Sequence, residues 1–287
     1  MIQFDQSYRA TLHIIRCFYA LTPLLILESE WRLFNVLANP PTDCLWVCRW
    51  FCELNFPVSK YSVYVFLLVT SILTATQPHL RMLRWFSFFG TLTMGGWVNS
   101  YGKIFHSHHL WISVSFLLAL IPSGTQNRRK NKYAFLVGVW WANLYIFFAY
   151  TAVGAMKIIP SIIFPDWGWI GPNHLIRVIL AHKLKMGHGL LDATHLDSIH
   201  SIFALVGVST FILFASSLFV FLLRSGIRTW SFLIICFHLA TYLAIEITFL
   251  PNIVLVVLFG LFCPFRKLQS NLFQPRRLAP FFFPKRF

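Results

Sequence analysis

The chain has 287 residues, of which 57% are hydrophobic, 18% aromatic and only 11% charged, and its mean hydropathy is +0.66. This composition lies outside the usual range of water-soluble domains and indicates an integral membrane protein. The formal net charge of +15 would suit nucleic acid only as a basic face on a folded soluble domain. It fits cytoplasmic loops and anionic lipid headgroups instead, so we expect a lipid bilayer and no nucleic acid as partner.

Apolar runs follow one another along most of the chain, and most have about the 17–25 residues that a helix needs to cross a bilayer. They predict an all-α, polytopic transmembrane helical bundle with about eight spans, or seven if the short final run does not cross. The runs cover residues 11–27, 60–77, 81–98, 108–123, 133–157, 202–223, 229–249 and 250–264.

The stretch at 44–55, CLWVCRWFCELN, is too short and too aromatic to cross, so we interpret it as an interfacial helix. Cys44, Cys48 and Cys52 recur in it every four residues and would line one face of a straight helix. This geometry disfavours pairing among the three. Packing of the stripe is one interpretation, and a disulfide to another segment is the other.

The basic residues predict the orientation, because positively charged loops stay in the cytoplasm. With the N-terminus inside, eight crossings place the loop 124–132 and the basic, aromatic tail 265–287 in the cytoplasm. Residues 98–107 and 158–200 then face outward, as do seven of the nine acids, Glu28 and Glu30 among them. We expect one transmembrane domain over 1–264, in a bacterial cytoplasmic membrane with both termini inside.

Polar and ionisable residues are concentrated in the segments predicted to face outward. The sequence WVNSYGKIFHSHHLW at 97–111 contains Asn99, Lys103 and three histidines. Lys103 and His106 would share a face if 99–106 is helical, and His108 lies at the start of the next span. The pattern lacks a carboxylate or cysteine at set spacing, so we expect no metal. The loop 158–200 includes PDWGWIGPN, which suits an interfacial, partly re-entrant segment.

Two features inside the spans carry ionisable groups. Lys157 ends the long apolar run that closes with YTAVGAMKI, where an ammonium is either functional or snorkels to the headgroups. His238, Tyr242 and Glu246 are spaced four apart and predict a polar stripe that faces the bundle. That stripe serves either interhelical hydrogen bonding or a substrate or proton role, and Glu246 is the only acid that we expect inside a span.

These residues resemble a known family. YTAVGAMKI is similar to the Tyr-x-x-x-Gly-x-x-Lys segment in the membrane domain of vitamin K-dependent gamma-carboxylases and their bacterial relatives, the horizontally transferred transmembrane (HTTM) domain proteins. Tyr150, Gly154 and Lys157 match in spacing. HSHHLW resembles the family's Asn-His segment, with His108 in the histidine position, and CFHL at 236–239 is similar to a later Phe-His. The resemblance covers roughly residues 10–265.

The resemblance implies that Lys157 acts as a base on a reduced vitamin K or menaquinone-type quinone, which then takes up oxygen and passes to an epoxide. His108 would orient the lysine or donate to a developing oxyanion. Lys103 and His106 are further candidate catalytic residues, because of their place beside His108 in the 97–111 stretch. Asn99, Tyr150, Gly154, His238, Tyr242 and Glu246 would line the binding site for this lipophile. A lysine base must be neutral, which burial favours.

The resemblance leaves three functions open. Carboxylases carry a large lumenal portion after the membrane domain and this chain ends in a short tail, so we do not expect peptide carboxylation. Quinol oxidation, epoxidation and base chemistry on another lipophilic substrate stay open. A separately encoded soluble partner would be compatible with that expectation. The alternatives are a non-catalytic membrane subunit or scaffold for a redox partner, and a transporter, for which the sequence offers few intramembrane polar residues and no inverted repeat.

Overall fold

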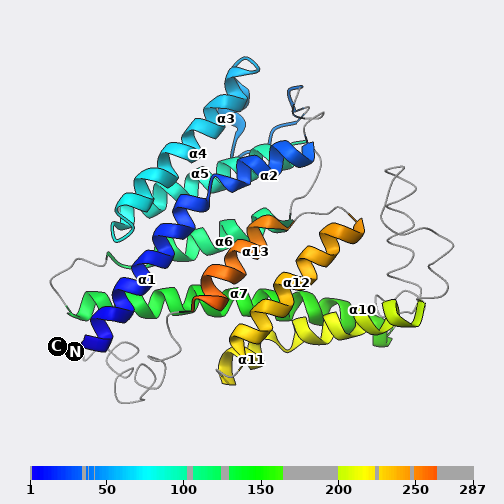
Figure 1. The fold of residues 1–287 in the computed structure, drawn as a ribbon. Helices are drawn as coiled ribbons and strands as arrows, with labels where there is room; N and C mark the ends of the chain where they lie inside the picture. Colours follow the sequence, from blue (N-terminus) through cyan, green and yellow to red (C-terminus); the bar gives the residue numbers. More distant parts are fainter. Residues whose placement is uncertain are drawn as a thin grey trace. The chain divides into compact units, whose positions relative to one another are not determined.

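The computed structural model describes residues 2–33, 37, 39–41, 43–101, 106–123, 129–163, 200–223, 226–245 and 249–263. All regular elements in these ranges are helices, which confirms the all-α prediction for this part of the chain (Figure 1). The helices are α1 (Ile2–Leu21), α2 (Leu24–Leu33), α3 (Arg49–Cys52), α4 (Val58–Thr76), α5 (Arg81–Asn99), α6 (His106–Leu120), α7 (Arg129–Ile163), α10 (His200–Ala215), α11 (Ser217–Leu223), α12 (Ile227–Ile245), α13 (Leu250–Val256) and the π-helix η2 (Val257–Leu261).

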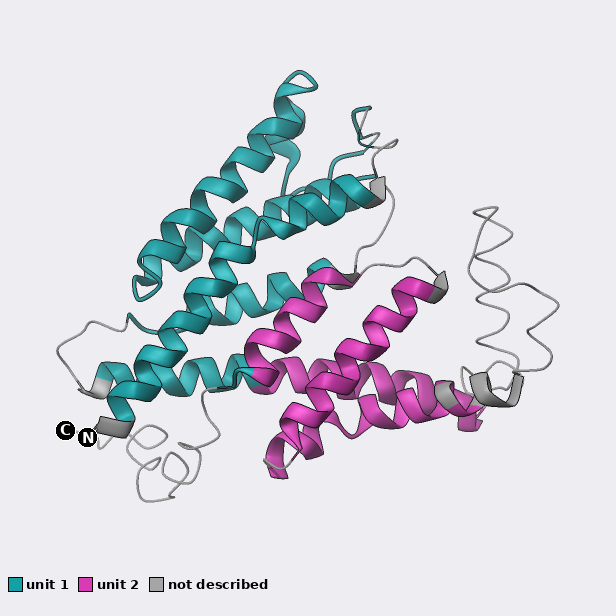
Figure 2. Ribbon diagram, viewed as in Figure 1, with its two compact units in different colours: residues 1–143, 262–287 teal, residues 144–261 magenta. Residues whose placement is uncertain are grey.

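The chain divides into two compact units, coloured separately in Figure 2. Unit 1 comprises residues 1–143 and 262–287, and unit 2 comprises 144–261. In unit 1, α4 packs on α5, α5 packs on α6, and α1 packs on α4. In unit 2, α12 packs on α13 and η2. The expectation of one transmembrane domain over 1–264 stays a prediction.

Three helical stretches within the described residues are long and apolar enough to cross a membrane: Phe4–Trp31, Val58–Thr76 and Asn131–Ile163. Shorter apolar helices cover His108–Leu120, Ile227–Leu243 and Leu250–Leu261. Together they indicate a membrane location for the chain.

Helix α4 has the polarity that lipid, rather than water, would select. Its exposed face carries Tyr61, Val65, Leu68 and Ile72, whereas it buries small polar residues such as Thr70. The hydroxyl of Thr70 donates to the carbonyl of Phe66 at 2.7 Å, so the helix itself satisfies it. Small residues at helix contacts and apolar residues outside are typical of membrane bundles, because lipid gives exposed apolar side chains no penalty.

Helix α5 is the centre of unit 1, because glycines let its neighbours approach closely. A Cβ on Gly90 would lie 2.6 Å from Thr70 Oγ1 of α4. A Cβ on Gly95 would lie 2.5 Å from Ile112 of α6, and one on Gly96 would overlap Val47. A side chain at these positions would therefore force Thr70, Ile112 or Val47 to shift.

The segment 44–55 differs from the predicted interfacial helix. Only Arg49–Cys52 is helical, and Cys44 forms a disulfide with Cys52 across a Cα–Cα distance of 6.5 Å. Eight residues of straight helix would separate these atoms by about 12 Å, so the turn that precedes α3 is what brings them together. The prediction that the three cysteines do not pair among themselves is wrong.

Cys48 remains a free thiol between the two bridged cysteines. It is buried, and its Sγ lies 3.5 Å from Ser100 Oγ. Ser100 Oγ also accepts the backbone N–H of Leu45 at 3.0 Å. Burial raises the pKa of the Cys48 thiol, so it stays neutral and packs the disulfide loop onto the end of α5.

Three further boundaries differ from the sequence prediction. Glu28 belongs to α2, inside the candidate span Phe4–Trp31, because the apolar run continues past Pro23 after a short turn. Helix α5 ends at Asn99, so 99–106 is not one helix. Helix α7 runs on to Ile163 through Pro160, and the first part of the expected outward loop is therefore helical. The rest of that loop, 164–199, and the tail from 264 lie outside the described residues.

Arg84 is fully buried in α5, and its guanidinium binds backbone carbonyls. Nε donates to Leu118 O at 2.8 Å and Nη1 to Pro78 O at 2.6 Å, while Nη2 donates to Ile121 O and Pro122 O. These carbonyls belong to the C-terminal end of α6 and to the turn before α5. The arginine thus satisfies carbonyls that a helix end leaves open.

Replacing Arg84 with leucine should destabilise unit 1 by about 3 kcal/mol or more, because several buried carbonyls lose their donors at once. Unfolding of the purified protein in mixed micelles would measure the loss. Arg81→Leu is the matched control, since Arg81 lies at the same end of α5 but is exposed. Equal stability of the two variants would contradict the capping role.

Candidate functional site

The residues of the Tyr-x-x-x-Gly-x-x-Lys segment lie along one face of α7 in unit 2. Tyr150, Gly154 and Lys157 are spaced i, i+4 and i+7, which brings them above one another on a helix. Lys157 follows Tyr150 by about 10 Å along the helix axis. The spacing therefore aligns the Tyr150 phenol, the backbone at Gly154 and the Lys157 amine along the helix.

Tyr150 meets His238 of α12. Its hydroxyl shares a hydrogen bond of 2.8 Å with His238 Nε2, and the two residues are only 4% and 3% exposed. His238 Nδ1 has no hydrogen-bond partner among the described residues. A buried ring nitrogen of this kind can bind a hydroxyl or carbonyl oxygen of a ligand, because leaving it unpaired is costly.

Aromatic rings cover the Tyr150–His238 pair. The Tyr150 ring packs edge-on against Phe214 and Trp230, with centroids 5.2 and 5.4 Å away. The His238 ring lies 5.0 Å from Phe249 and 5.4 Å from Phe237. The pair is therefore a polar contact enclosed by an aromatic wall, formed by Phe214, Trp230, Phe237 and Phe249.

Gly154 explains how the surrounding helices come so close to α7. A Cβ at this position would fall on the backbone of Ala215, at the end of α10. One turn earlier, Thr151 Oγ1 accepts the backbone N–H of Leu218 at 2.9 Å. Gly154 and Thr151 together dock α7 against the α10–α11 junction.

Lys157 is half-buried and lies near the Pro160 position in α7. Proline has no N–H, so the helix loses one hydrogen bond there. Ser161 Oγ donates to Lys157 O at 2.7 Å, which supplies a local bond at this weakened turn. The backbone that carries the lysine is thus held in helical form up to Ile163.

The polar stripe expected on α12 contained two further residues, Tyr242 and Glu246. Tyr242 lies one turn beyond His238 but is 38% exposed, so the buried polar stripe does not extend to it. Glu246 lies outside the described residues. Of the stripe residues that the structure describes, His238 is the one that joins Tyr150 in the aromatic wall.

The polar stretch at 97–111 belongs to unit 1, where its described side chains bind neighbours. His108 is fully buried, and its Nε2 lies 3.1 Å from Glu28 Oε2. Asn99 Nδ2 lies 3.3 Å from His109 Nε2. His106 begins α6 with only its backbone described, and Lys103 lies outside the described residues. Convergence of these residues with Lys157 on one cavity stays a prediction.

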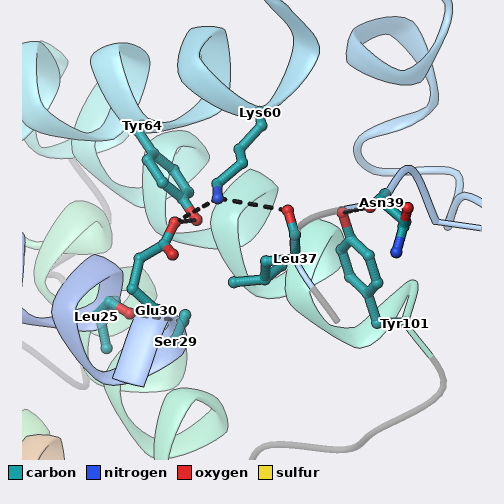
Figure 3. Close-up of polar contacts among 8 residues, drawn as sticks. All are labelled: Leu25, Ser29, Glu30, Leu37, Asn39, Lys60, Tyr64 and Tyr101. Atoms are coloured by element: carbon teal, nitrogen blue, oxygen red, sulfur yellow. Dashed lines mark hydrogen bonds and ion pairs between the residues drawn. The ribbon is translucent and has the colours of Figure 1, made fainter. Parts of the chain in front are cut away.

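A second polar cluster lies at the same end of unit 1 (Figure 3). Glu30 Oε1 accepts from Lys60 Nζ at 2.8 Å and from the Tyr64 hydroxyl at 2.6 Å. Lys60 Nζ also donates to Leu37 O at 3.4 Å. Tyr101 donates to Asn39 O at 2.9 Å, and burial raises the pKa of this tyrosine to about 12. These contacts tie Leu37 to α4 and Asn39 to Tyr101, which follows the end of α5.

Sequence reasoning missed Glu28 because LLILESEW was divided into a span and an outward loop. The apolar periodicity of residues 24–33 is the signal that would have kept Glu28 inside a helix. It also missed Trp230 and Phe249, for which no local motif existed. The described residues contain no group of three or more metal-ligating side chains.

Comparison with protein-family models, with curated proteins and with solved structures finds no match to this chain. Any function must therefore be inferred from the geometry of the site and from the sequence resemblance.

Substitution of Gly154 by alanine should lower the stability of unit 2 by about 1–3 kcal/mol, because the new methyl group overpacks against the Ala215 backbone. Gly207→Ala is the matched control, since no atom lies within 4 Å of a Cβ built there. It should be neutral or stabilise by about 0.5–1 kcal/mol. Thermal unfolding in detergent compares the two, and equal effects would contradict the close approach.

Proposed function

We propose that the chain is an integral membrane enzyme in which Lys157 acts as a base on a reduced quinone or a similar lipophile that reacts with oxygen. The observation that carries this proposal is the hydrogen bond between Tyr150 and His238 within an aromatic wall, with Lys157 on the same face of α7. It rests also on the resemblance to the gamma-carboxylase membrane domain. Peptide carboxylation is not part of the proposal.

The residues present suit such a substrate. A quinol is a flat ring with two hydroxyl groups, and it would supply the electrons that reduce oxygen. Aromatic side chains stack on flat rings, and His238 Nδ1 offers a polar contact for one oxygen. The Tyr150 hydroxyl can donate to His238 Nε2 or accept from it, so Nδ1 takes the complementary role and can donate to a quinol oxygen or accept from its hydroxyl.

Lys157 would take the hydroxyl proton. A neutral amine is required, and the membrane interior disfavours the charged ammonium. In this scheme His238 orients the substrate and Lys157 removes the proton, while the aromatic rings exclude water from the reacting atoms.

A non-catalytic scaffold for a redox partner is the second candidate. It is favoured by the contacts of Glu30, Lys60, Asn99 and His108, which all bind groups of unit 1 itself. Polar residues that are used internally stabilise a bundle without performing chemistry.

We also propose eight spans, formed by α1–α2, α4, α5, α6, α7, α10–α11, α12 and α13–η2. The 44–52 loop would face outward, because disulfides persist on the oxidising side of a membrane. Ser100 binds this loop, so the end of α5 would share that side. Both termini would then be cytoplasmic, in a bacterial cytoplasmic membrane, and the 164–199 segment would include the partly re-entrant part.

Lys157 distinguishes the enzyme from the scaffold. Lys157→Arg and Lys157→Ala should both lower oxygen-dependent loss of reduced menaquinone by roughly 10²–10⁴-fold, the usual effect of losing a general base. Arginine fails because its guanidinium does not deprotonate. The assay uses purified protein in nanodiscs, and Lys132→Arg on the same helix is the control that should retain activity.

Equal rates in wild type and both Lys157 variants would refute the lysine base. If wild type itself consumes no quinol, the scaffold becomes the better interpretation. An arginine variant that keeps full activity would show that Lys157 only snorkels to the headgroups.

The topology has an independent test that keeps the Cys44–Cys52 disulfide and replaces the free cysteines. Asn55→Cys and Gln77→Cys then introduce single exposed thiols at opposite ends of α4. An impermeant thiol reagent should label the first in intact cells and the second only after permeabilisation. The reverse pattern would invert the proposed orientation.

A further inference from the structure

The end of unit 1 at which α4 turns into α5 carries a group of basic side chains. His79 belongs to the turn, Arg81 is the first residue of α5, and Arg16 lies on α1, which packs on α4. Arg16 and Arg81 are exposed, and His79 is partly exposed. These three residues, named the basic cluster below, have no part in the proposed reaction.

The backbone and the packing bring the members of the basic cluster together. Leu80 has an extended backbone, and the residues on either side of an extended residue point the same way. His79 and Arg81 therefore share one side of the turn. Burial and the positive charges of Arg84 and Arg16 lower the pKa of His79, so the arginine of α1 lies close enough to act on the turn.

The positive charge of the basic cluster is not balanced by a carboxylate of the described residues. Elsewhere in unit 1, Lys60 has Glu30 at 2.8 Å, and Lys132 has Asp5 at 2.8 Å. In the described part of the chain, the three residues of the basic cluster form no ion pair of this kind. Because like charges repel, a cluster without its own acid is stabilised by an anion.

An exposed apolar face begins directly beside Arg81. On α5, Met82, Phe86 and Phe89 are 71%, 48% and 48% exposed, and their spacing places them along one side of the helix. Phe116 of α6 is exposed too, and its ring centroid lies 5.2 Å from that of Phe88 on α5. The surface thus has a charged end, from which an apolar face runs along the helices.

We propose that the basic cluster binds the phosphate of an anionic phospholipid, whose acyl chains lie along the face formed by Met82, Phe86 and Phe89. The ligand class is a phosphodiester with a net negative charge and two long chains, for which phosphatidylglycerol is the probe. This site belongs to unit 1 alone and does not depend on the function proposed above.

The side chains suit a phosphate group. Each guanidinium presents a planar fork of N–H donors that matches two phosphate oxygens. The lowered pKa of His79 keeps its imidazole largely neutral at pH 7, so it supplies a hydrogen-bond donor while the two arginines supply the charge.

The apolar face selects a lipid over a soluble phosphate. A free phosphate or a nucleotide would balance the arginines but leave Met82, Phe86 and Phe89 uncovered, whereas a phospholipid matches both parts of the surface. The net charge selects among lipids, because phosphatidylcholine adds a fixed cation beside its phosphate. Basic loops are attracted to anionic membranes in general, but this site requires Arg16 and Arg81 on two different helices.

The test measures how added lipids with identical acyl chains stabilise the purified protein in detergent. A ligand that binds the folded state raises the unfolding temperature, and the lipid concentration at half of that rise reports the affinity. Phosphatidylglycerol should bind wild type roughly 30-fold more tightly than phosphatidylcholine, the equivalent of about 1 kcal/mol for each of two arginines.

Single substitutions locate the site. Arg16→Gln and Arg81→Gln should each reduce the preference for phosphatidylglycerol roughly fivefold. Arg49→Gln is the matched control, because Arg49 is equally an exposed arginine but lies on α3, ahead of the opposite end of α4. Its preference should equal that of wild type.

An equal loss of preference in Arg49→Gln would overturn the site, because net charge alone would then determine lipid binding. Inorganic phosphate that stabilises wild type as strongly as phosphatidylglycerol at the same concentration would overturn a lipid as the ligand. A wild type without preference between the two lipids would contradict the proposal outright.

A second measurement applies if the arginine variants do not fold. The ring of Trp85 lies 6.0 Å from that of Phe89, so a bound acyl chain that carries bromine should quench its fluorescence. Brominated phosphatidylglycerol should quench wild type more than brominated phosphatidylcholine does, and Trp85→Phe should lose this excess. An excess that survives in Trp85→Phe would contradict the location of the lipid.

Discussion

Arg84 shows the constraint on which unit 1 depends, namely that the open carbonyls of a helix end in lipid must find donors within the protein. The end of α6 leaves backbone carbonyls without donors, and lipid offers none. A guanidinium has five N–H groups in a fixed fork, and Arg84 directs them to carbonyls of Leu118, Ile121 and Pro122 and of the neighbouring turn at Pro78. The pKa of His79, in the same turn, is lowered by burial and by the positive charge of Arg84. One side chain thus joins three segments.

The same rule explains the other contacts of both units. Serines and threonines bond to carbonyls one turn back, as Thr22 does to Phe18 and Ser231 to Ile227. Glycines remove side chains where two backbones must approach, as at Gly90 in unit 1 and Gly154 in unit 2. The Tyr150 hydroxyl pairs with His238 Nε2, and Glu28 Oε2 pairs with His108 Nε2. The residues proposed for chemistry are therefore made of the same kinds of contact that hold the helices together.

Hydropathy predicted the helices because the length and apolar character of a span are local properties of the sequence. Each expected run overlaps helical residues, and three described stretches are long and apolar enough to cross a membrane. Tyr150, Gly154 and Lys157 share a face because helical periodicity is also local. Partners across the bundle are not local. Nothing near Tyr150 indicates His238, and nothing near His108 indicates Glu28. The disulfide was predicted wrongly because the cysteine spacing was read as a straight helix, whereas a turn before α3 folds Cys44 back to Cys52.

The three cysteines of the 44–52 loop allow more than one pairing, since Cys48 is four residues from each partner in the disulfide. Cys48 avoids exchange because it is buried, neutral and held at Ser100. That protection exists only once the loop has docked on the end of α5. Before that docking Cys48 lacks this protection, so selective pairing of Cys44 with Cys52 depends on the packing of the loop against α5. The Cys44–Cys52 disulfide therefore indicates that the loop had already packed on α5 when the bridge formed.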